Sequence, residues 1–379
     1  MSEDKNKFFS QTIISWYHQN KRELPWRDTQ NPYKIWLSEI ILQQTRVIQG
    51  MPYYEKFIEH FPTVQELAAA DEQTVLRLWQ GLGYYSRARN LHAAAKYISD
   101  ELNGIFPKTY NEIKKLKGVG DYTAAAISSF AFDEVQAVVD GNVYRVLSRF
   151  FGIEKDITIG KNQKEFRELA QNLIDKKQPA IYNQAIMEFG ALQCVPKSPN
   201  CKVCPLQKKC TAFEKNLIEK LPLKGKKTKV TDRFMHYFVF VAGESKEKKV
   251  LVRQRQEGDI WQGLYDFFVI EFQNKDKKGF EPISALKHKL QEDNIDTIEK
   301  DLSLKLTHES IIFKHQLSHR TLYAKFYTIE IAQQEKKSLF WQILKEKYNL
   351  EEINWAALDK IPKPVLISKY LDYLGAHLF

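Results

Sequence analysis

All four cysteines of this 379-residue chain lie in one stretch of sequence, CVPKSPNCKVCPLQKKC, at Cys194, Cys201, Cys204 and Cys210. Cysteines clustered in this way in a reducing compartment more often bind metal than form disulfides. The spacing therefore restricts residues 194–210 to a loop that wraps around a metal centre.

The spacing C-x6-C-x2-C-x5-C also bears on the kind of metal centre. A structural zinc site usually has two close pairs of ligands separated by a longer span. Here one C-x2-C pair has a single cysteine on each side, which suits four thiolates approaching an iron–sulfur cubane from different directions. We predict one [4Fe-4S] cluster; the alternatives are zinc and four incidental buried cysteines. Interleaved lysines make the loop basic, which indicates contact with phosphate.

Charge and hydropathy restrict the partners of the chain. Lys and Arg number 57 against 47 Asp and Glu, and the net charge of +10 indicates a polyanionic partner such as nucleic acid. No apolar run reaches the roughly 18 residues needed to span a membrane. The first residues also lack the pattern of a secretory signal. We therefore expect no membrane partner and a cytoplasmic location, associated with the nucleoid in a bacterium.

The pattern of apolar residues changes past the middle of the chain. The first part has them at helical spacing, as in FFSQTIISWY. After about residue 221, runs rich in aromatic and β-branched residues, such as RFMHYFVFVAG and LYAKFYTIEI, indicate strands that alternate with two helical segments. We predict a multidomain protein with an all-α domain over residues 1–220, a basic linker over 221–231 and an α+β domain over 232–379.

The segment IKKLKGVGDYTAAAISSF places a short glycine turn between two helical patterns. Gly118 and Gly120 flank Val119, and glycine permits backbone angles that are closed to other residues. The amides at the start of the second helix then point outward with the helix dipole behind them. We predict a helix-hairpin-helix motif that holds a DNA phosphate without reading a base. Ordinary helix turns also use glycine, so the support comes from VVDGNVYRVLSRF, about 20 residues downstream.

The LKGVG hairpin, the aspartate of VDGNV and the cysteine loop together resemble the endonuclease III superfamily of DNA base-excision glycosylases. LPWRDTQNPYKIWLSEIILQQTRV and GLGYYSRARNL are similar to segments of the MutY-type adenine glycosylases. These enzymes of base excision repair remove adenine mispaired with 8-oxoguanine, and also with guanine, in duplex DNA. The resemblance covers about residues 10–210 and implies a monomer. It also implies a six-helix barrel over about 30–135, and an iron–sulfur lobe formed by the N-terminal helix and residues 136–220.

Excision of adenine requires two carboxyl groups in different protonation states. One donates a proton to the leaving base, and the other stays ionised beside the sugar cation. In YKIWLSEIILQQTRVI, Glu39 lies among apolar helix positions, so we expect burial to raise its pKa. The resemblance makes Glu39 the acid that protonates adenine at N7. Without the resemblance, the simpler interpretation is a surface residue of an amphipathic helix.

Asp140 is the second carboxyl. By itself it is a helix N-cap, a position that aspartate fills well and that favours the ionised form. The resemblance implies that ionised Asp140 stabilises the oxocarbenium-like sugar, and that Asn142 orients either Asp140 or the attacking water. The alternative for Asn142 is an ordinary turn residue.

Tyr122, the second residue after the GVG turn, decides between two types of reaction. Relatives that also cleave the strand have a lysine at this catalytic position, which forms a Schiff base with the sugar. Tyr122 therefore predicts a monofunctional enzyme that releases the base and leaves an abasic site. The alternative is an aromatic residue that only packs.

A base inside a duplex must be extruded before an enzyme can act on it, and its place in the stack must be filled. The resemblance assigns three residues to the adenine pocket, namely Arg22, Trp26 and Gln184. It places Gln44, Leu82 and Tyr84 on the duplex side, where Gln44 and Tyr84 enter the stack. Trp26, Leu82 and Tyr84 would equally fit a core, but GLGYYSRAR surrounds Tyr84 with glycine and arginine, as on a nucleic-acid surface.

The α+β domain resembles a Nudix domain at DIWQGLYDFFVIEF. A Nudix hydrolase follows this strand with a helix carrying R-E-x-x-E-E, whereas NKDKKGFEPISALKHKLQED has no such acidic array. We therefore predict a Nudix-like domain that recognises the lesion instead of hydrolysing a nucleotide. The family's reading loop is Phe-Ser-His; here it is Leu317, Ser318 and His319, and leucine cannot stack as phenylalanine would. Ser318 and His319 can supply the hydrogen bonds; the alternative is a polar turn.

Three other functions remain open at this point. A thymine mismatch glycosylase also has a tyrosine after the hairpin, although the extra C-terminal domain disfavours it. A non-catalytic sensor of DNA structure would need neither Glu39 nor Asp140. A Nudix-type phosphohydrolase is disfavoured because the acidic helix is missing.

Overall fold

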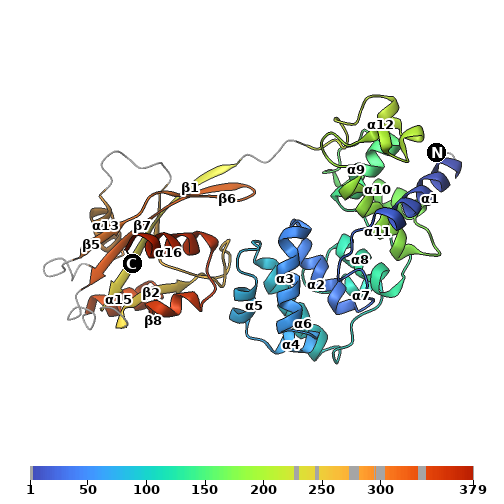
Figure 1. Ribbon diagram of the computed structural model, residues 1–379. Coiled ribbons are helices and arrows are strands. Elements are labelled where there is room, and N and C mark those ends of the chain that lie inside the picture. Colours follow the sequence, from blue (N-terminus) through green and yellow to red (C-terminus); the bar gives the residue numbers. More distant parts are fainter. Residues whose placement is uncertain are drawn as a thin grey trace. The chain divides into compact units, whose positions relative to one another are not determined.

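The computed structural model describes residues 3–225, 230–243, 247–272, 281–293, 295, 304–331 and 339–378 (Figure 1). Contacts divide the chain into a helical unit, Met1–Ala70 with Arg89–Lys227, and a second unit, Asp71–Ala88 with Thr228–Phe379. Within the expected basic linker, residues 226–229 lie outside the described residues. No helix in the described ranges is long and apolar enough to cross a membrane.

Helices make up most of the chain as far as residue 225 (Figure 1). The α-helices are α1 Glu3–Asn20, α2 Pro32–Leu42, α3 Val47–His60, α4 Val64–Ala69, α5 Glu72–Leu78, α6 Ser86–Asp100, α7 Tyr110–Ile113, α8 Asp121–Phe132, α9 Gly141–Phe151, α10 Gly160–Leu173, α11 Pro179–Leu192 and α12 Thr211–Glu214. Two short 3-10 helices, η1 Cys201–Val203 and η2 Gln207–Lys209, lie within the cysteine loop. Helix α5 and the start of α6 belong to the second unit.

The helical unit has a core in which α1 packs against α9, α10 and α11. Phe9 of α1 is fully buried, and its ring centroid lies 4.8 Å from that of Phe150 on α9. The apolar stripe predicted for the first helix therefore faces this core, as the periodicity requires.

Two helix starts position the chemistry of this unit. Asn31 caps α2 by accepting hydrogen bonds from two backbone amides, and Pro32 occupies the first helical position. Asp140 caps α9 in the same way, so the predicted N-cap is confirmed. Both caps satisfy amides that a helix start otherwise leaves unpaired, which fixes where α2 and α9 begin.

The second unit contains a mixed sheet that has eight strands among the described residues. The strands are β1 Thr231–Ala242, β2 Lys249–Gln254, β3 Tyr265–Asp266, β4 Phe268–Phe272, β5 Lys305–Glu309, β6 Phe313–Gln316, β7 Arg320–Ile331 and β8 Glu351–Asn354. The main order is β3-β2-β1-β7-β5, with β4 also on β1, β6 on β7 and β8 on β2. The long central pair β1–β7 is parallel, and the other pairs are antiparallel.

Helices cover both faces of this sheet, which confirms the predicted α+β class. Helices α13 Pro282–Glu292 and α15 Leu339–Lys347 pack with Tyr327 on one face. On the other face, Tyr370 of α16 Val365–Leu378 stacks on Phe326 with ring centroids 4.0 Å apart. Neighbouring residues of β7 thus bury opposite faces, as the alternation of a strand requires. A short 3-10 helix, η5 Trp355–Asp359, follows β8.

Candidate active site

A cavity of about 1060 Å³ lies in the helical unit, lined mainly by α2, α8, α9, α11 and the segments before α2 and α3. Most of the residues singled out in the first part of the sequence line it: Arg22, Trp26, Glu39, Gln44, Gly120, Tyr122, Asp140, Asn142 and Gln184. The structure therefore brings together residues that are up to 162 positions apart, between Arg22 and Gln184. Leu82, Tyr84, Ser318 and His319 lie in the other unit.

Glu39 is buried in the middle of α2, with only 7% of its surface exposed. The pKa of Glu39 is raised to about 7, chiefly by burial; the Asp140 carboxyl acts in the same direction, and a hydrogen bond from Tyr122 acts against it. The Tyr122 hydroxyl donates that bond to Glu39 Oε2 at 2.8 Å. The predicted rise in pKa is confirmed, and its cause is the apolar surroundings of α2.

Asp140 accepts hydrogen bonds on both carboxylate oxygens. Its Oδ1 accepts from the amides of Asn142 and Val143 at 2.8 and 2.7 Å, and its Oδ2 accepts from Asn142 Nδ2 at 2.8 Å. Burial nevertheless raises the pKa of Asp140, against these hydrogen bonds. The hydrogen bonds at the helix start favour the ionised form, as expected, but burial outweighs them and sets the direction of the pKa shift.

The two carboxyls have different hydrogen-bonding surroundings. Asp140 meets donors only, so a proton on either oxygen would displace a hydrogen bond. Glu39 accepts a single hydrogen bond in the described structure and has a pKa near neutrality. The pair can therefore hold a proton at Glu39 and a negative charge at Asp140, as acid-assisted cleavage of a glycosidic bond requires.

Two arginines and one buried glutamate form a second group at this cavity. The sequence interpretation assigned Arg22 to the pocket and missed its partners Arg27 and Glu188. Arg22 NH2 and Arg27 NH2 lie 2.6 and 2.7 Å from Glu188 Oε2. Burial alone would raise the pKa of Glu188, but hydrogen bonds from Arg22 and Arg27 outweigh it and lower the pKa to about 2. Glu188 lies one helical turn after Gln184 on α11, and this spacing was the available signal.

Trp26 and Gln184 complete the wall of the cavity. Trp26 is 8% exposed and meets Tyr54 edge-on, with ring centroids 5.0 Å apart. The hydroxyl of Tyr17, another residue that the sequence interpretation missed, donates to Gln184 Oε1 at 2.6 Å. On this wall the cavity therefore offers the indole ring of Trp26 and the amide of Gln184, which a residue of α1 holds.

The glycine turn between α7 and α8 has one strained position. Gly118 has a φ of 81°, and a Cβ there would lie 2.7 Å from Asn90 Cβ, so this position requires glycine. Gly120 has an ordinary φ of −96° and open space around it, so the expectation of special backbone angles at both glycines is wrong for Gly120. Gly120 instead caps α8 without a side-chain hydrogen bond, which leaves the first amides available to a ligand.

The four cysteine side chains form a loosely spaced group on the helical unit. Each is partly exposed and unpaired by disulfide, and burial raises the pKa of Cys204 to about 12. Among the described residues, no three His, Cys, Asp or Glu side chains are close enough to hold a single metal ion. The thiols are near enough to affect one another's titration, and Arg149 NH1 donates to Cys194 Sγ at 3.5 Å. Four cysteine sulfurs beside a cation are a donor set that an iron–sulfur cluster can use.

The expected lesion-reading residues lie on an exposed turn of the second unit. Ser318 and His319 are exposed between β6 and β7, and Leu317 donates its backbone N–H to Arg320 at 2.8 Å. The Tyr84 hydroxyl lies 3.0 Å from Ser318 Oγ. Leu82 is 5% exposed, whereas Tyr84 is 46% exposed, so only Tyr84 presents a large surface to a partner.

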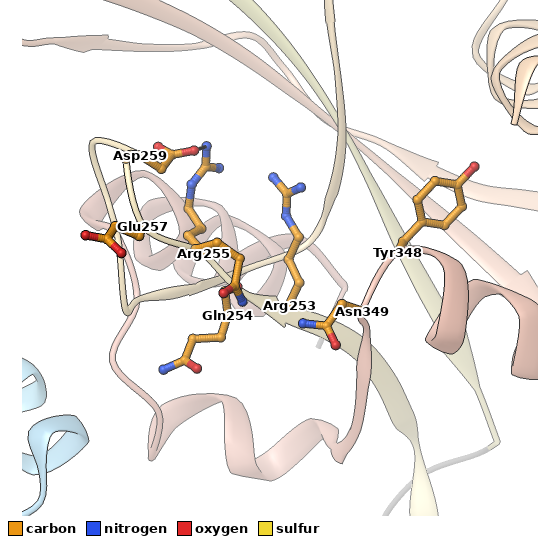
Figure 2. Close-up of a pocket in the computed structure, with 9 residues that line it drawn as sticks. Arg253, Gln254, Arg255, Glu257, Asp259, Tyr348 and Asn349 are labelled. Atoms are coloured by element: carbon orange, nitrogen blue, oxygen red, sulfur yellow. Dashed lines mark hydrogen bonds and ion pairs between the residues drawn. The ribbon is translucent and has the colours of Figure 1, made fainter.

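The second unit has its own cavity of about 340 Å³ between the β2–β3 loop and the end of α15 (Figure 2). Arg253 and Arg255 line it, and in Figure 2 the Arg255 guanidinium points to Asp259. Both arginines also pair with the buried Asp266. Because two carboxylates already balance these two cations, the cavity has no excess positive charge for a diphosphate. Helix α13, where a Nudix hydrolase would place its acidic array, reads PISALKHKLQE. Residues 273–280, which precede this helix in the segment that lacks the array in sequence, lie outside the described residues.

The chain combines a glycine hairpin, a buried acid beside an N-capping aspartate, and a Nudix-like second unit. This combination defines the class of the helix-hairpin-helix DNA N-glycosylases, and comparison with known proteins agrees. The HhH-GPD superfamily of base excision DNA repair proteins matches residues 37–176, and the NUDIX domain family matches residues 238–373.

Proteins that are similar to this chain over most of its length narrow the class to one family. The adenine DNA glycosylase of Buchnera aphidicola subsp. Schizaphis graminum is 35% identical over 364 residues, which is 94% of this chain and 96% of that protein. The enzyme of the same name from Buchnera aphidicola subsp. Baizongia pistaciae is 36% identical over 322 residues, or 83% of this chain and 84% of that protein. The solved structure of a thermostable thymine-DNA glycosylase is 30% identical to this chain, with a TM-score of 0.52. The match covers 56% of this chain and 98% of that one. The chain belongs to the adenine DNA glycosylase family and is a DNA N-glycosylase of base excision repair.

Proposed function

We propose that this chain excises adenine paired with 8-oxoguanine, and with guanine, in duplex DNA, and that it does so as a monofunctional, hydrolytic enzyme. The hydrogen bond from Tyr122 to Glu39, in one cavity with Asp140, carries the proposal. Lysine is absent from the described residues that line this cavity. Schiff-base chemistry needs an amine at the sugar, so water is the nucleophile that the site favours.

The reaction follows from the two carboxyls. Glu39, with a pKa of about 7, gives its proton to N7 of the extruded adenine, so that the base leaves with the electrons of the glycosidic bond. Asp140, held by Asn142, stabilises the positive charge that develops on the sugar. Water then adds to the sugar C1′, and the proton it loses passes to a carboxylate.

The remaining site residues contact either the extruded base or the duplex. Arg22, Trp26 and Gln184 contact the extruded adenine, and the turn of Gly118, Val119 and Gly120 holds a backbone phosphate. On the duplex side we place Gln44, Leu82 and Tyr84, and on the 8-oxoguanine Ser318 and His319. In this proposal residues 1–220 cut the bond, residues 232–379 read the lesion, and the enzyme acts as a monomer.

We also propose that Cys194, Cys201, Cys204 and Cys210 hold a [4Fe-4S] cluster. When bound, the cluster cross-links the loop through four thiolate bonds and needs no redox step in the reaction above. Arg149 donates to Cys194 Sγ and to the carbonyl oxygens of Val195 and Pro196, so it would offset the negative charge of the thiolates. The loop can then present its lysines to the DNA backbone.

The test is release of free base from a panel of duplexes. The full chain is incubated with duplexes that contain one 8-oxoguanine:adenine, guanine:adenine or guanine:thymine pair, and released bases and strand breaks are measured separately. Adenine released from the first two, without strand breaks before alkali, is the expected result. Release of thymine, or breaks that accompany base release, would contradict the proposal.

A further inference from the structure

Tyr17 and Gln184 form a buried contact at the wall of the cavity. Tyr17 is on α1 and 4% exposed, whereas Gln184 is on α11 and lines the cavity. The hydroxyl-to-Oε1 distance of 2.6 Å is that of a well-formed hydrogen bond from a hydroxyl group. The Arg27 guanidinium, which is paired with Glu188, lies 5.8 Å from the Tyr17 ring centroid and keeps this ring in place.

The contact fixes which end of the glutamine amide faces the cavity. A glutamine side chain has one acceptor oxygen and one NH2 donor. If the amide were flipped, the NH2 group would meet the Tyr17 oxygen, and the Tyr17 proton would lose its only acceptor in the described part of the chain. An unsatisfied buried hydroxyl is costly, so the oxygen stays on Tyr17 and the NH2 group is left for a ligand.

We propose that Tyr17 is a positioning residue for base selectivity: it holds the Gln184 amide so that the NH2 group selects a base with a ring nitrogen acceptor. Adenine and guanine both offer lone pairs at N3 and N7, and they differ at N1, where adenine has a lone pair and guanine carries a hydrogen. The amide therefore favours adenine over guanine where its NH2 group meets N1, and Tyr17 acts without touching the base. This inference rests on the proposed excision of adenine.

Kinetics with modified bases tests this role. Because the amide meets the base both before and during bond cleavage, loss of its orientation should weaken binding more than the rate of cleavage. For Tyr17→Phe we expect the half-saturating enzyme concentration in single turnover to rise roughly 3- to 10-fold, as for one lost hydrogen bond. Replacing adenine by 1-deazaadenine, which removes the N1 acceptor, should raise this concentration by a similar factor in the parent and only a little in Tyr17→Phe. A penalty in the parent that is confined to 3-deazaadenine would place the amide at an acceptor that guanine shares, and would refute a role in base selectivity. Equal penalties in both proteins, or none in the parent, overturn the proposal.

Two further variants separate orientation from structure. Tyr182→Phe removes a buried hydroxyl from the same helix as Gln184, away from the cavity, and should leave the analogue penalties unchanged. Gln184→Met has no amide to orient, so adding Tyr17→Phe to it should have no further effect on binding. An additive effect of the two changes would show that Tyr17 acts through packing alone.

A measurement without catalysis keeps this inference separate from the proposed function. The side-chain NH2 resonance of Gln184, identified by its loss in Gln184→Met, is followed as free adenine is added to ¹⁵N-labelled protein. It should shift in the parent and in Tyr182→Phe, and the adenine concentration for half the shift should rise roughly 3- to 10-fold in Tyr17→Phe. If the parent shows this response but releases no base from DNA, the proposed function fails and this inference stands. An identical response in Tyr17→Phe refutes the inference even where adenine is released.

Discussion

Glu39→Gln should stabilise the protein, and by an amount that depends on pH. The rise of the Glu39 pKa from 4.5 to about 7 means that ionising this residue opposes folding. At about 1.4 kcal/mol for each tenfold change in proton affinity, the rise corresponds to about 3 kcal/mol. Glutamine is neutral at every pH, has nearly the same shape and can still accept the hydrogen bond of Tyr122.

The sign of the difference in stability between the variant and the parent follows from the direction of the pKa change. Below pH 4.5 Glu39 is protonated in both folded and unfolded chains, so the parent and variant should have similar free energies of unfolding. Between pH 4.5 and about 7 only the unfolded chain ionises, and the parent loses stability relative to the variant. Above pH 7 both states are ionised and the difference is constant at its largest value.

Urea unfolding of the full chain at several pH values between about 5 and 8.5 measures this difference. Glu55→Gln is the matched control, because Glu55 is an exposed glutamate on α3, the helix after α2, and its replacement should leave stability nearly unchanged at each pH. A difference between Glu39→Gln and the parent that does not grow with pH would refute the reasoning. The same variant should lose base release, since it has no proton to give.

Three further results are expected of other residues. Asp140→Asn should lower the excision rate by about 10²-fold or more while the dissociation constant for duplex DNA changes little, because the charge matters most in the transition state; both are measured on 8-oxoguanine:adenine duplexes. Tyr122→Lys should give a protein–DNA adduct on borohydride treatment that the parent does not give, and trapping in the parent would contradict a monofunctional reaction. Ser318→Ala combined with His319→Ala should reduce the preference for 8-oxoguanine:adenine over guanine:adenine pairs by roughly 5- to 150-fold, from about 1–3 kcal/mol for polar base contacts, with adenine excision retained.

Local chemistry explains how much of the site could be predicted from the sequence. The order Asp140–Gly141–Asn142 before an apolar run predicts a helix N-cap from neighbours within one helical turn. The apolar positions around Glu39 are compatible with burial, but they favour it over a surface position only together with the family resemblance. The Tyr122–Glu39 hydrogen bond spans 83 positions, and only the resemblance to a known family brought those two residues together.

The features that were missed depend on contacts between distant segments. Arg22 and Arg27 meet Glu188 across 166 and 161 positions, and Tyr17 meets Gln184 across 167. No periodicity in the sequence encodes such pairs, because the two partners of each pair lie on segments that only the tertiary fold brings together. In the second unit, three strands were also not predicted: β5, β6 and β8. They are short and rich in charged residues, and they are strands because β7 and β2 offer them hydrogen-bonding edges.

Asp140 shows why a local rule can give the right geometry and the wrong electrostatics. The N-cap pattern predicts the hydrogen bonds to Asn142 and Val143 and a preference for the ionised form; the hydrogen bonds are present, whereas burial raises the pKa. Burial removes the carboxyl from water, and this depends on tertiary packing. A burial of this kind cannot be read from the few residues that form the cap.

Helix α9 joins the two features that were recognised separately in the sequence. Its first turn carries Asp140 and Asn142, and Arg145, one turn later, donates to Asn142 Oδ1 at 2.9 Å and to the backbone oxygen of Cys194 at 2.7 Å. Arg149, one further turn along, donates to Cys194 Sγ and to two carbonyl oxygens of the same loop. The orientation of the Asn142 amide is therefore tied to the backbone of the cysteine loop through the guanidinium of Arg145. A loop that lost its shape would leave Arg145 with a buried unsatisfied donor, and the strain would fall on Asn142 and Asp140.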